Sequence, residues 1–441
     1  MTFTIALQFL VVLAAIWMGA RSSGVGLGLW GAVGLLVLVA GFGINPTSPP
    51  IDVMLIILAV IMAASVMEAA GGIDFLVRIA ERIIRANPKY VTIVAPLTTW
   101  TFTFVAGTGH IVYPLLPVIY ETAHRSGIRP ERPMAVATIA SQQAITASPV
   151  AAATAAMIGL FADKGIAHWG LAQVLMICVP ATLTGVVAAA IVSMFVGKDL
   201  KDDPEYQARL AAGQIPAPQA DTERAPLQPG AKLSAFIFLT GVALVVLFGF
   251  FPSLRQLPGA KSPLAMPLVI EILMMSVAAI MLLLTKVPVD EVPKTATLRA
   301  GVVAVIGIFG LAWLGDSFIA ANKDVIVPAI GDWAKVAPWT FAFGLFLASV
   351  LLYSQAATTR ALMPLGIALG IPPQFLIAMF PSVNGYFFIP TYGSLIAAIN
   401  FDLSGTTKIG KYVLNHSFMI PGLVATSVAV FTGLLIAQAI F

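Results

Sequence analysis

Long apolar runs alternate with short polar segments along almost the whole chain. The runs cover residues 3–20, 24–44, 51–70, 91–120, 134–162, 169–197, 233–252, 263–285, 298–320, 338–370, 372–400 and 412–440. An α-helix needs about 20 apolar residues to cross a bilayer. The pattern therefore predicts an all-α polytopic membrane protein.

Two polar stretches interrupt this pattern. Residues 71–90 place apolar side chains at helical spacing, which predicts an amphipathic helix on the membrane surface. Residues 198–232 are rich in Pro, Gln and charge and form a predicted cytoplasmic linker, helical near 203–212. The linker divides the chain into halves at 1–197 and 233–441.

The two halves share spacings between polar residues and prolines. In 107–117 and 354–364 a proline lies ten residues after a small residue that begins the segment. In 141–149 and 382–390 a proline lies eight residues after a serine. We therefore predict two structural repeats, each with five spans and one re-entrant hairpin. An odd number of spans makes the repeats inverted, with broken helices at the midplane, an arrangement typical of secondary transporters.

The predicted hairpins occupy 91–124 and 338–370, because each divides into arms too short to cross a bilayer alone. In the second, Arg360 is the only charged residue between Lys335 and Asp402. A lone guanidinium in the membrane costs about 2.5–3.5 kcal/mol and by default marks a binding or transport site. In the alternative interpretation, Arg360 snorkels or pairs with an acid such as Asp316, without any ligand.

Each predicted hairpin is followed by a broken span, at 134–162 and at 372–400. Ser148-Pro149 predicts a half-helix beginning at residue 149, and Pro390 predicts one beginning there. With the second arms of the hairpins, four helix N-termini would converge near the midplane. Their partial positive charges suit an anion. The alternative for each Ser-Pro or Pro-Thr pair alone is a helix kink.

Composition narrows the class. The chain is 59% hydrophobic and 10% charged, with a mean hydropathy of +0.96. Its net charge of +4 is spread over short loops, which argues against nucleic acid as a partner. One cysteine and four histidines form no metal-ligand spacing, and no nucleotide-binding or hydrolase motif occurs. We expect no cofactor, no metal and no enzymatic activity.

Basic residues predict the orientation. With both termini in the periplasm, 18 of the 24 Lys and Arg residues lie in cytoplasmic loops and five in external loops, among them the predicted loop 321–335. Positive charge favours the cytoplasmic side. A full crossing by 91–120 would move Arg125, Arg129 and Arg132 outside.

Polar residues at the tips and breaks are the candidate substrate-binding set. They are Thr108, Gly109, His110, Gln142, Thr146, Ser148, Ser354, Gln355, Thr358, Thr359, Arg360, Asn384, Thr391 and Tyr392. Glu68 and Asp316 occupy matching positions before the two hairpins and are candidates for ion coupling. They can equally be helix-end acids that face water.

Six segments resemble the anaerobic C4-dicarboxylate transporter family of the DcuA/DcuB type: NPKYVTIVAP (87–96), AGTGH (106–110), QQAITASP (142–149), AWLGD (312–316), LLYSQAATTRALMP (351–364) and GTTKIGKYVLNHSFMIPG (405–422). The resemblance implies a bacterial inner-membrane carrier that exchanges or takes up fumarate, succinate, malate or aspartate. It also implies a fold like that of the wider ion-transporter superfamily, and a homodimer in which hairpin-and-broken-helix domains move past a dimeric scaffold.

The main hypothesis is therefore a secondary carrier for four-carbon dicarboxylates that works by exchange, with H⁺- or Na⁺-coupled symport as the alternative. A channel would need a continuous polar pore. A membrane-embedded enzyme built on His110 with Glu68 or Asp316 would lack a nucleophile or metal.

Overall fold

The computed structural model describes residues 2–22, 24–166, 168–215, 226–260, 262–352 and 354–441. Part of the predicted linker, 216–225, lies outside the described residues, as do Lys261 and Tyr353. The regular secondary structure of the described residues is entirely helical, apart from one isolated antiparallel bridge between Ile409 and His416.

Among the described residues ahead of the linker there are nine helices. They are α1 (Thr2–Ser22), α2 (Gly26–Phe42), α3 (Ile51–Ala69), α4 (Gly72–Ala86), α5 (Val91–Ala106), α6 (Val112–Arg125), α7 (Glu131–Gln143), α8 (Ala152–Asp163) and α9 (Leu171–Ser193). Helix α10 (Pro204–Ala211) lies in the linker, and Asp203 caps it by accepting hydrogen bonds from the N–H groups of Glu205 and Tyr206.

The part of the chain that the structure describes after the linker contains nine further helices. They are α11 (Ala231–Phe250), α12 (Met266–Thr285), α13 (Ala296–Gly307), α14 (Trp313–Val336), α15 (Phe341–Leu352), α16 (Gln355–Ala368), α17 (Pro373–Met379), α18 (Gly393–Phe401) and α19 (Met419–Ile440). A π-helical turn, Ile308–Ala312, joins α13 to α14.

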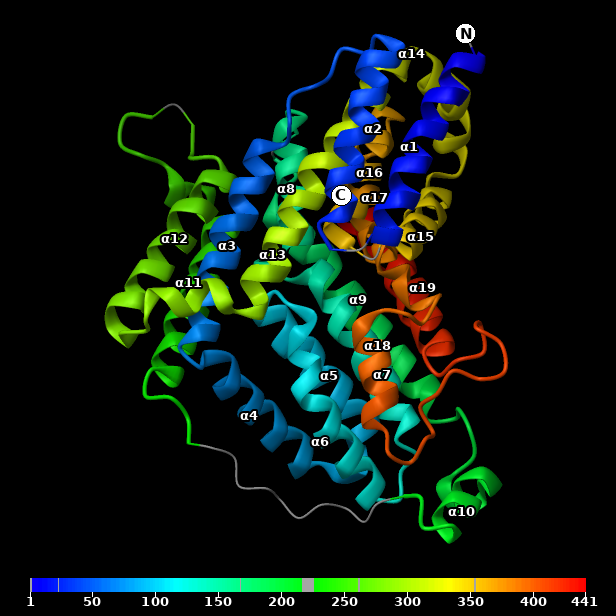
Figure 1. Cartoon of the computed structure of the whole chain (residues 1–441). Coiled ribbons are helices and arrows are strands. Elements are labelled where there is room, and N and C mark those ends of the chain that lie inside the picture. Colours follow the sequence, from blue (N-terminus) through cyan, green and yellow to red (C-terminus); the bar gives the residue numbers. More distant parts are fainter. Residues whose placement is uncertain (1, 23, 167, 216–225, 261, 353) are drawn as a thin grey trace.

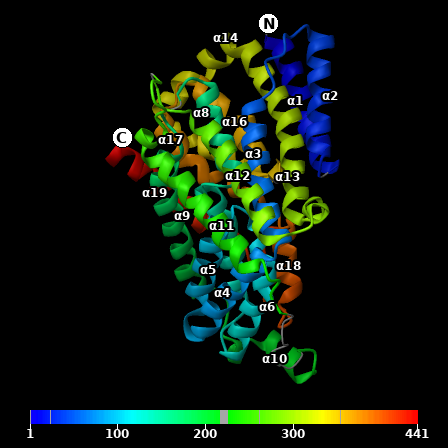
Figure 2. The same cartoon turned by 90° about the vertical axis from the view of Figure 1, so that its left-hand side faces the viewer.

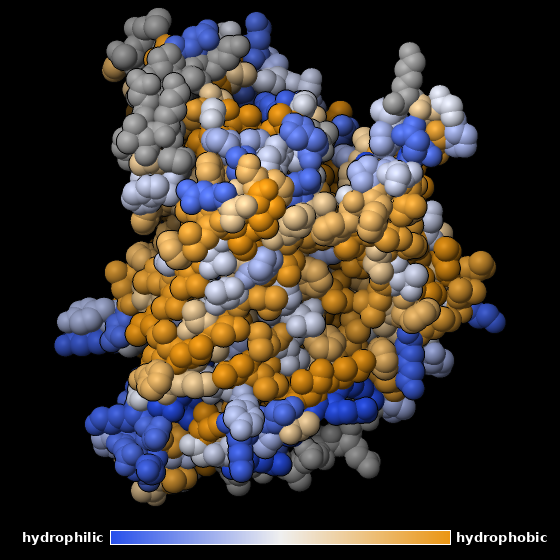
Figure 3. All heavy atoms as spheres, turned by 180° about the vertical axis from the view of Figure 1, so that it is seen from behind, coloured by the Kyte–Doolittle hydropathy of each residue, from blue (hydrophilic) through white to orange (hydrophobic). Residues whose placement is uncertain are grey.

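The surface and the helix lengths both fit a membrane protein. Figure 3 shows a broad hydrophobic zone across the middle of one face, with hydrophilic residues gathered above and below it. Among the described residues, seven helical segments are long and apolar enough to cross a bilayer, and they cover 51–69, 131–163, 171–193, 231–250, 266–285, 296–322 and 419–440.

The helices form two packed groups. Helices α1–α3 pack mainly on one another and on α11–α14, and we call these helices the span body. Helices α5–α9 pack mainly on one another and on α15–α19, and we call these the hairpin body. Both groups draw on both halves of the chain, so the linker does not separate them.

Small residues allow the span body to pack closely. A Cβ atom added at Gly310 in the π-helical turn would lie 1.7 Å from the carbonyl oxygen of Gly28 in α2. A Cβ at Gly31 would lie 2.5 Å from the backbone of Gly310. Without side chains at these positions, the two backbones come into contact, as is common between membrane helices.

The paired helices α5–α6 and α15–α16 lie at opposite ends of the molecule. In Figure 1 the first pair occupies the lower half and the second the upper half, and Figure 2 agrees for α5, α6 and α16. Both chain termini lie in the upper half of these views, and α10 lies at the bottom.

Four predicted boundaries are wrong. The loop expected at 321–335 belongs to α14, which continues to Val336. The run at 412–440 becomes helical only at Met419, because the preceding residues fold back through the Ile409–His416 bridge. The half-helices begin at Ala152 and Gly393 rather than at 149 and 390. In the first of them, Ser148 and Ala151 have extended backbones, and Ser148 accepts a hydrogen bond from Val150 N–H instead of starting a helix.

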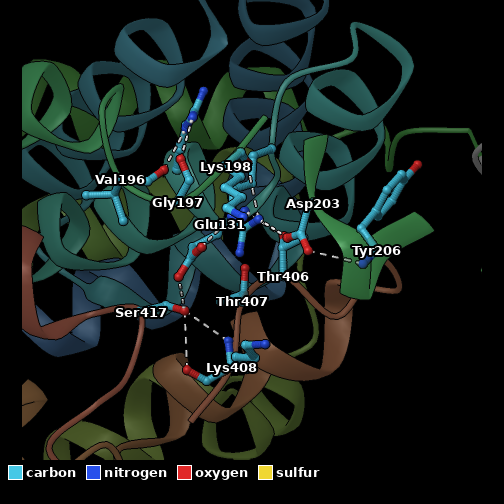
Figure 4. A network of polar contacts seen from close by, with 12 residues as sticks. Glu131, Val196, Gly197, Lys198, Asp203, Tyr206, Thr406, Thr407, Lys408 and Ser417 are labelled. Atoms are coloured by element: carbon cyan, nitrogen blue, oxygen red, sulfur yellow. Dashed lines mark hydrogen bonds and ion pairs between the residues drawn. The ribbon is translucent and has the colours of Figure 1, made fainter. Parts of the chain in front are cut away.

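A polar network holds the start of the linker against the hairpin body (Figure 4). Arg129, 6% exposed, pairs with Glu131 at 2.6 Å and with Asp203. Glu131 also accepts a hydrogen bond from the Ser417 hydroxyl at 2.6 Å. Burial alone would raise the pKa of Asp203, but hydrogen bonds from Arg129 and from the backbone of α10 hold that pKa below its ordinary value. Asp203 thus stays ionised at neutral pH and keeps α10 docked.

Candidate functional site: a cavity at the hairpin tips

A cavity of about 580 Å³ lies on the boundary between the two bodies. The span body contributes residues of α3, α13 and the α1–α2 corner, including Ile61, Thr297 and Gly301. The hairpin body contributes the tips of both helix pairs and both breaks. The volume falls within the range typical of small-molecule sites.

The first turns of four helices reach this cavity. The lining includes Thr108–His110 ahead of α6, Ala152 and Ala153 of α8, Ser354–Ala357 at the start of α16, and Tyr392 and Gly393 at the start of α18. The predicted convergence of four helix N-termini is therefore present. Each N-terminus carries free N–H groups and roughly half a positive charge.

The first tip is a tight turn held against α7 and the first break. Gly107 has φ +70°, and a Cβ there would lie 2.6 Å from the Val150 carbonyl oxygen. The Thr108 hydroxyl accepts a hydrogen bond from His110 N–H at 3.3 Å. The Ser141 hydroxyl donates to the Gly109 carbonyl at 3.2 Å. These contacts fix the position of the backbone that lines the cavity.

The second tip begins with a capped helix. The Ser354 hydroxyl accepts a hydrogen bond from Ala357 N–H at 3.2 Å, which makes Ser354 the N-cap of α16. Gln355 and Ala356, which precede that bond, form the first turn of α16 and line the cavity. A helix start of this kind favours anions.

A chain of carboxamides ties the second tip to both breaks. Gln355 donates to the Gln142 side-chain oxygen at 3.2 Å and to the Asn384 side-chain oxygen at 2.8 Å. Asn384 donates to Gln143 at 3.2 Å, and Gln143 donates to Thr426 of α19 at 2.9 Å. Buried polar groups in folded proteins are almost always hydrogen-bonded, and this chain of carboxamides supplies the partners for those that are buried here.

The cavity contains little formal charge. Its described lining includes one histidine, His110, and no Lys, Arg, Asp or Glu. His110 stacks on Tyr113 with ring centroids 5.9 Å apart. Tyr392, at the start of α18, lies 4.6 Å from Tyr386 by ring centroids. An anion here would meet helix ends, amides and aromatic rings rather than a fixed cation.

Eight predicted site residues line the cavity and six do not. Those on the cavity are Thr108, Gly109, His110, Gln142, Ser354, Gln355, Thr391 and Tyr392. Thr146, Ser148, Thr358, Thr359, Arg360 and Asn384 are absent from its described lining. Three of the hydroxyls donate to carbonyls three or four residues earlier in the chain (Thr146 to Gln143, Thr358 to Ser354 and Thr359 to Gln355).

Arg360 is ion-paired away from the cavity. Its side chain, 1% exposed, donates to Asp163 Oδ2 at 3.2 Å and to Asp316 Oδ2 at 3.5 Å. This geometry favours the alternative that Arg360 pairs with an acid such as Asp316, and a direct substrate contact of Arg360 stays a prediction. Asp163 gave no signal in the sequence because it lies 197 residues from its partner at the end of an ordinary apolar helix.

Glu68 belongs to the last turn of α3, and its side chain lies against the start of α13. Its two carboxylate oxygens accept hydrogen bonds from the N–H groups of Ala296 and Thr297, each at 3.0 Å. This caps α13 and complements its dipole. The geometry agrees with the helix-end alternative for Glu68 rather than with a coupling role.

The cavity wall on the span body was missed entirely. Thr297 and Gly301 line it, and a Cβ at Gly301 would lie 2.2 Å from Ile61 Cδ1. The small residues of the 298–320 run were the available signal, since they allow a close approach of backbone to neighbouring side chains. Tyr113 of α6, on the hairpin body, was also missed.

Comparison with known proteins identifies the family. A family described as anaerobic C4-dicarboxylate membrane transporters matches residues 4–441. The chain belongs to this family. It is a multi-pass inner-membrane transporter and not an enzyme.

Its relatives cover it from end to end. The chain is 40% identical to the anaerobic C4-dicarboxylate transporter DcuB of Escherichia coli O6:H1 over 99% of both chains. It is 41% identical to the C4-dicarboxylate transporter DcuA of Wolinella succinogenes over 98% of both. Identity to DcuA of Escherichia coli K12 is also 41%, over 98% of this chain and 99% of the relative.

Two solved transporters share the fold. The YdaH transporter of Alcanivorax borkumensis superposes with a TM-score of 0.54 at 15% identity, over 92% of this chain and 87% of the other. The MtrF efflux pump of Neisseria gonorrhoeae superposes with a TM-score of 0.52 at 14% identity, over 92% and 84%.

Proposed function

We propose that the protein is a secondary carrier of C4-dicarboxylates such as fumarate, succinate, malate and aspartate. The observation that carries the proposal is the cavity at which four helix N-termini meet, in a chain about 40% identical to DcuA and DcuB transporters. A dianion of four carbons has a negative group at each end, so two separated clusters of N–H donors suit it.

In this proposal the two carboxylates lie at the two tips. One accepts hydrogen bonds from the start of α16, at Ser354 and Gln355. The other lies at Thr108, Gly109 and His110, on the opposite tip. Gln142 lies between them and is already hydrogen-bonded to Gln355. Thr391 and Tyr392 close the side of the cavity formed by the second break.

The transport step follows from the two bodies. We propose that the halves are inverted repeats, that both helix pairs are re-entrant hairpins, and that the hairpin body moves past the span body in an elevator-like motion. The cavity on their boundary supports this, since relative movement would carry bound substrate between the two sides. A homodimer would hold the span bodies fixed.

Counterflow tests the transport proposal. We expect labelled fumarate uptake into proteoliposomes preloaded with unlabelled dicarboxylate to exceed uptake into empty ones by at least about tenfold. The reason is that an empty site leaves partly positive helix ends without a counter-ion in a low-dielectric setting. Equal uptake into empty liposomes, driven by an imposed H⁺ or Na⁺ gradient, would favour symport instead. No saturable uptake at all would remove the carrier proposal.

The proposed orientation places both termini in the periplasm, as the distribution of basic residues predicts. Ser126, after α6, and Ser253, after α11, are both exposed. In a Cys178→Ala background, we expect an impermeant thiol reagent to label Ser126→Cys only from the cytoplasm and Ser253→Cys only from the periplasm. Labelling of both from one side would contradict the inverted arrangement.

A further inference from the structure

The buried side chain of Arg360 is the centre of a group of three charges that spans the boundary between the two bodies, with Asp316 half-buried and Asp163 partly exposed. It lies on α16, Asp163 lies at the end of α8, and Asp316 lies in the first turn of α14. Two carboxylates therefore share one guanidinium. The group lies outside the described lining of the cavity, so substrate does not neutralise it directly.

The contacts within this group are incomplete. Arg360 Nε and Asp316 Oδ1 are buried and have no hydrogen-bond partner among the described residues. The Arg360–Asp316 distance of 3.5 Å is also longer than the 3.2 Å to Asp163. A buried ion pair with open hydrogen-bonding positions offsets its desolvation cost poorly. By these distances, Arg360 binds Asp316 more weakly than it binds Asp163.

We propose that Asp163 is the permanent counter-ion of Arg360 and that Asp316 acts as a latch. Its ion pair with Arg360 holds the span body against the hairpin body, and protonation of Asp316 breaks this pair. The proposal rests on the proposed function, because a latch matters only if the bodies move. Helices α8 and α16 pack on each other within the hairpin body, so the Asp163 pair travels with them. Asp316 belongs to the span body, so its contact with Arg360 must break when the bodies separate.

Protonation provides the release. A carboxylate that loses its partner in a low-dielectric setting is costly, and it takes up a proton instead. Here the proton comes from water and binds one oxygen of Asp316, while Arg360 keeps Asp163. No other bond changes. Rebinding of Arg360 returns the proton to water, so the latch closes and opens once in each cycle.

Two cations and one further acid act on Asp316, so removal of its contact with Arg360 leaves one cation, Lys164, against Asp163. The charged groups that act on it are Arg360, Lys164 and Asp163. Asp163 itself also faces Asp52, an exposed residue of the first turn of α3. Asp52 therefore provides a matched control: an acid nearby that makes no contact with Arg360 in the described structure.

Removal of one or the other acid is expected to have opposite effects on the rate and pH dependence of exchange. We expect wild-type exchange in proteoliposomes to be at least about threefold faster at about pH 6.5 than at about pH 8.5, where a dicarboxylate remains ionised in both cases. Asp316→Asn should remove this dependence and keep the fast rate. Asp163→Asn should be slower and more steeply pH-dependent, because Asp316 becomes the only partner of Arg360. Asp52→Asn should keep the wild-type ratio, and both single-acid variants leave one balanced ion pair for folding.

A second measurement detects the latch without transport. A Cβ at Gly315 in α14 would lie 3.9 Å from the Cα atom of Ala361 in α16, across the same boundary. We expect the pair Gly315→Cys and Ala361→Cys, in a Cys178→Ala background at fixed pH, to form a disulfide at least about threefold more slowly when Asp316→Asn is added. Asp163→Asn should not slow it.

An unchanged pH ratio and an unchanged disulfide rate in Asp316→Asn would overturn the latch. Absence of dicarboxylate exchange in the wild type would instead overturn the proposed function, and the disulfide measurement would still decide the latch.

Discussion

Replacing Arg360 with methionine is expected to lower the free energy of unfolding by about 2–3 kcal/mol, because the half-buried carboxylate of Asp316 then loses its cation, whereas solvent screens much of the loss at Asp163. Asp316 has a side chain only 12% exposed, and Asp163 one that is 30% exposed, so water compensates the loss incompletely. Equilibrium denaturation in mild detergent measures the change.

The same variant separates a structural role of Arg360 from a role in substrate binding. Combining Arg360→Met with Asp163→Asn and Asp316→Asn removes all three charges, and we expect this variant to recover most of the lost stability. A direct substrate contact predicts a different result. In that case Arg360→Met would be as stable as the wild type and would bind fumarate at least about tenfold more weakly, and the ion-pair interpretation would be wrong.

Replacing Gly107 with alanine is expected to reduce transport by at least about tenfold. Alanine at φ +70° costs about 1–2 kcal/mol, and its Cβ would also lie 2.6 Å from the Val150 carbonyl oxygen. Because that oxygen belongs to the backbone of the first break, the tip itself has to shift. The shift would move Thr108 and Gly109 away from the cavity, which dicarboxylate uptake measures directly.

Gly127 provides a control with the same backbone strain and no clash. It has φ +71°, and a Cβ there would have no atom within 4 Å. Gly127→Ala should therefore cost about 1–2 kcal/mol of stability and leave transport close to wild type. Equal transport in the two variants would mean that the contact between Gly107 and Val150 does not position the tip.

The features that depend on a few neighbouring residues, such as helices and helix ends, could be predicted from the sequence alone. The apolar runs predicted most of the helices, since run length and turn residues act over a few positions. Ser354 was placed at the second tip, and it caps α16. The polar residues before Pro149 predicted a break in a long apolar run, and the helix indeed stops at Gln143. Where two local signals competed, as at Ser148-Pro149, the boundary moved by three residues.

The sequence also predicted that four helix starts would converge, because recurring spacings relate the two halves. It could not decide which side chains would face the cavity. An α-helix turns by about 100° per residue, so Arg360, five positions after Gln355, points about 140° away from it. Gln355 therefore faces Gln142 and Asn384, and Arg360 faces Asp163 and Asp316.

Those partners come from distant parts of the chain. Asp163 lies 197 residues from Arg360, and Gln142 lies 213 residues from Gln355. Local pattern carries no information about such pairs, because they depend on how whole helices pack. The sequence by itself determined that this is a helical membrane protein, of a known transporter family, with helix starts at its tips. Only the tertiary structure decided that its one isolated arginine is balanced by two acids, one in each body, because packing sets the direction of every buried side chain.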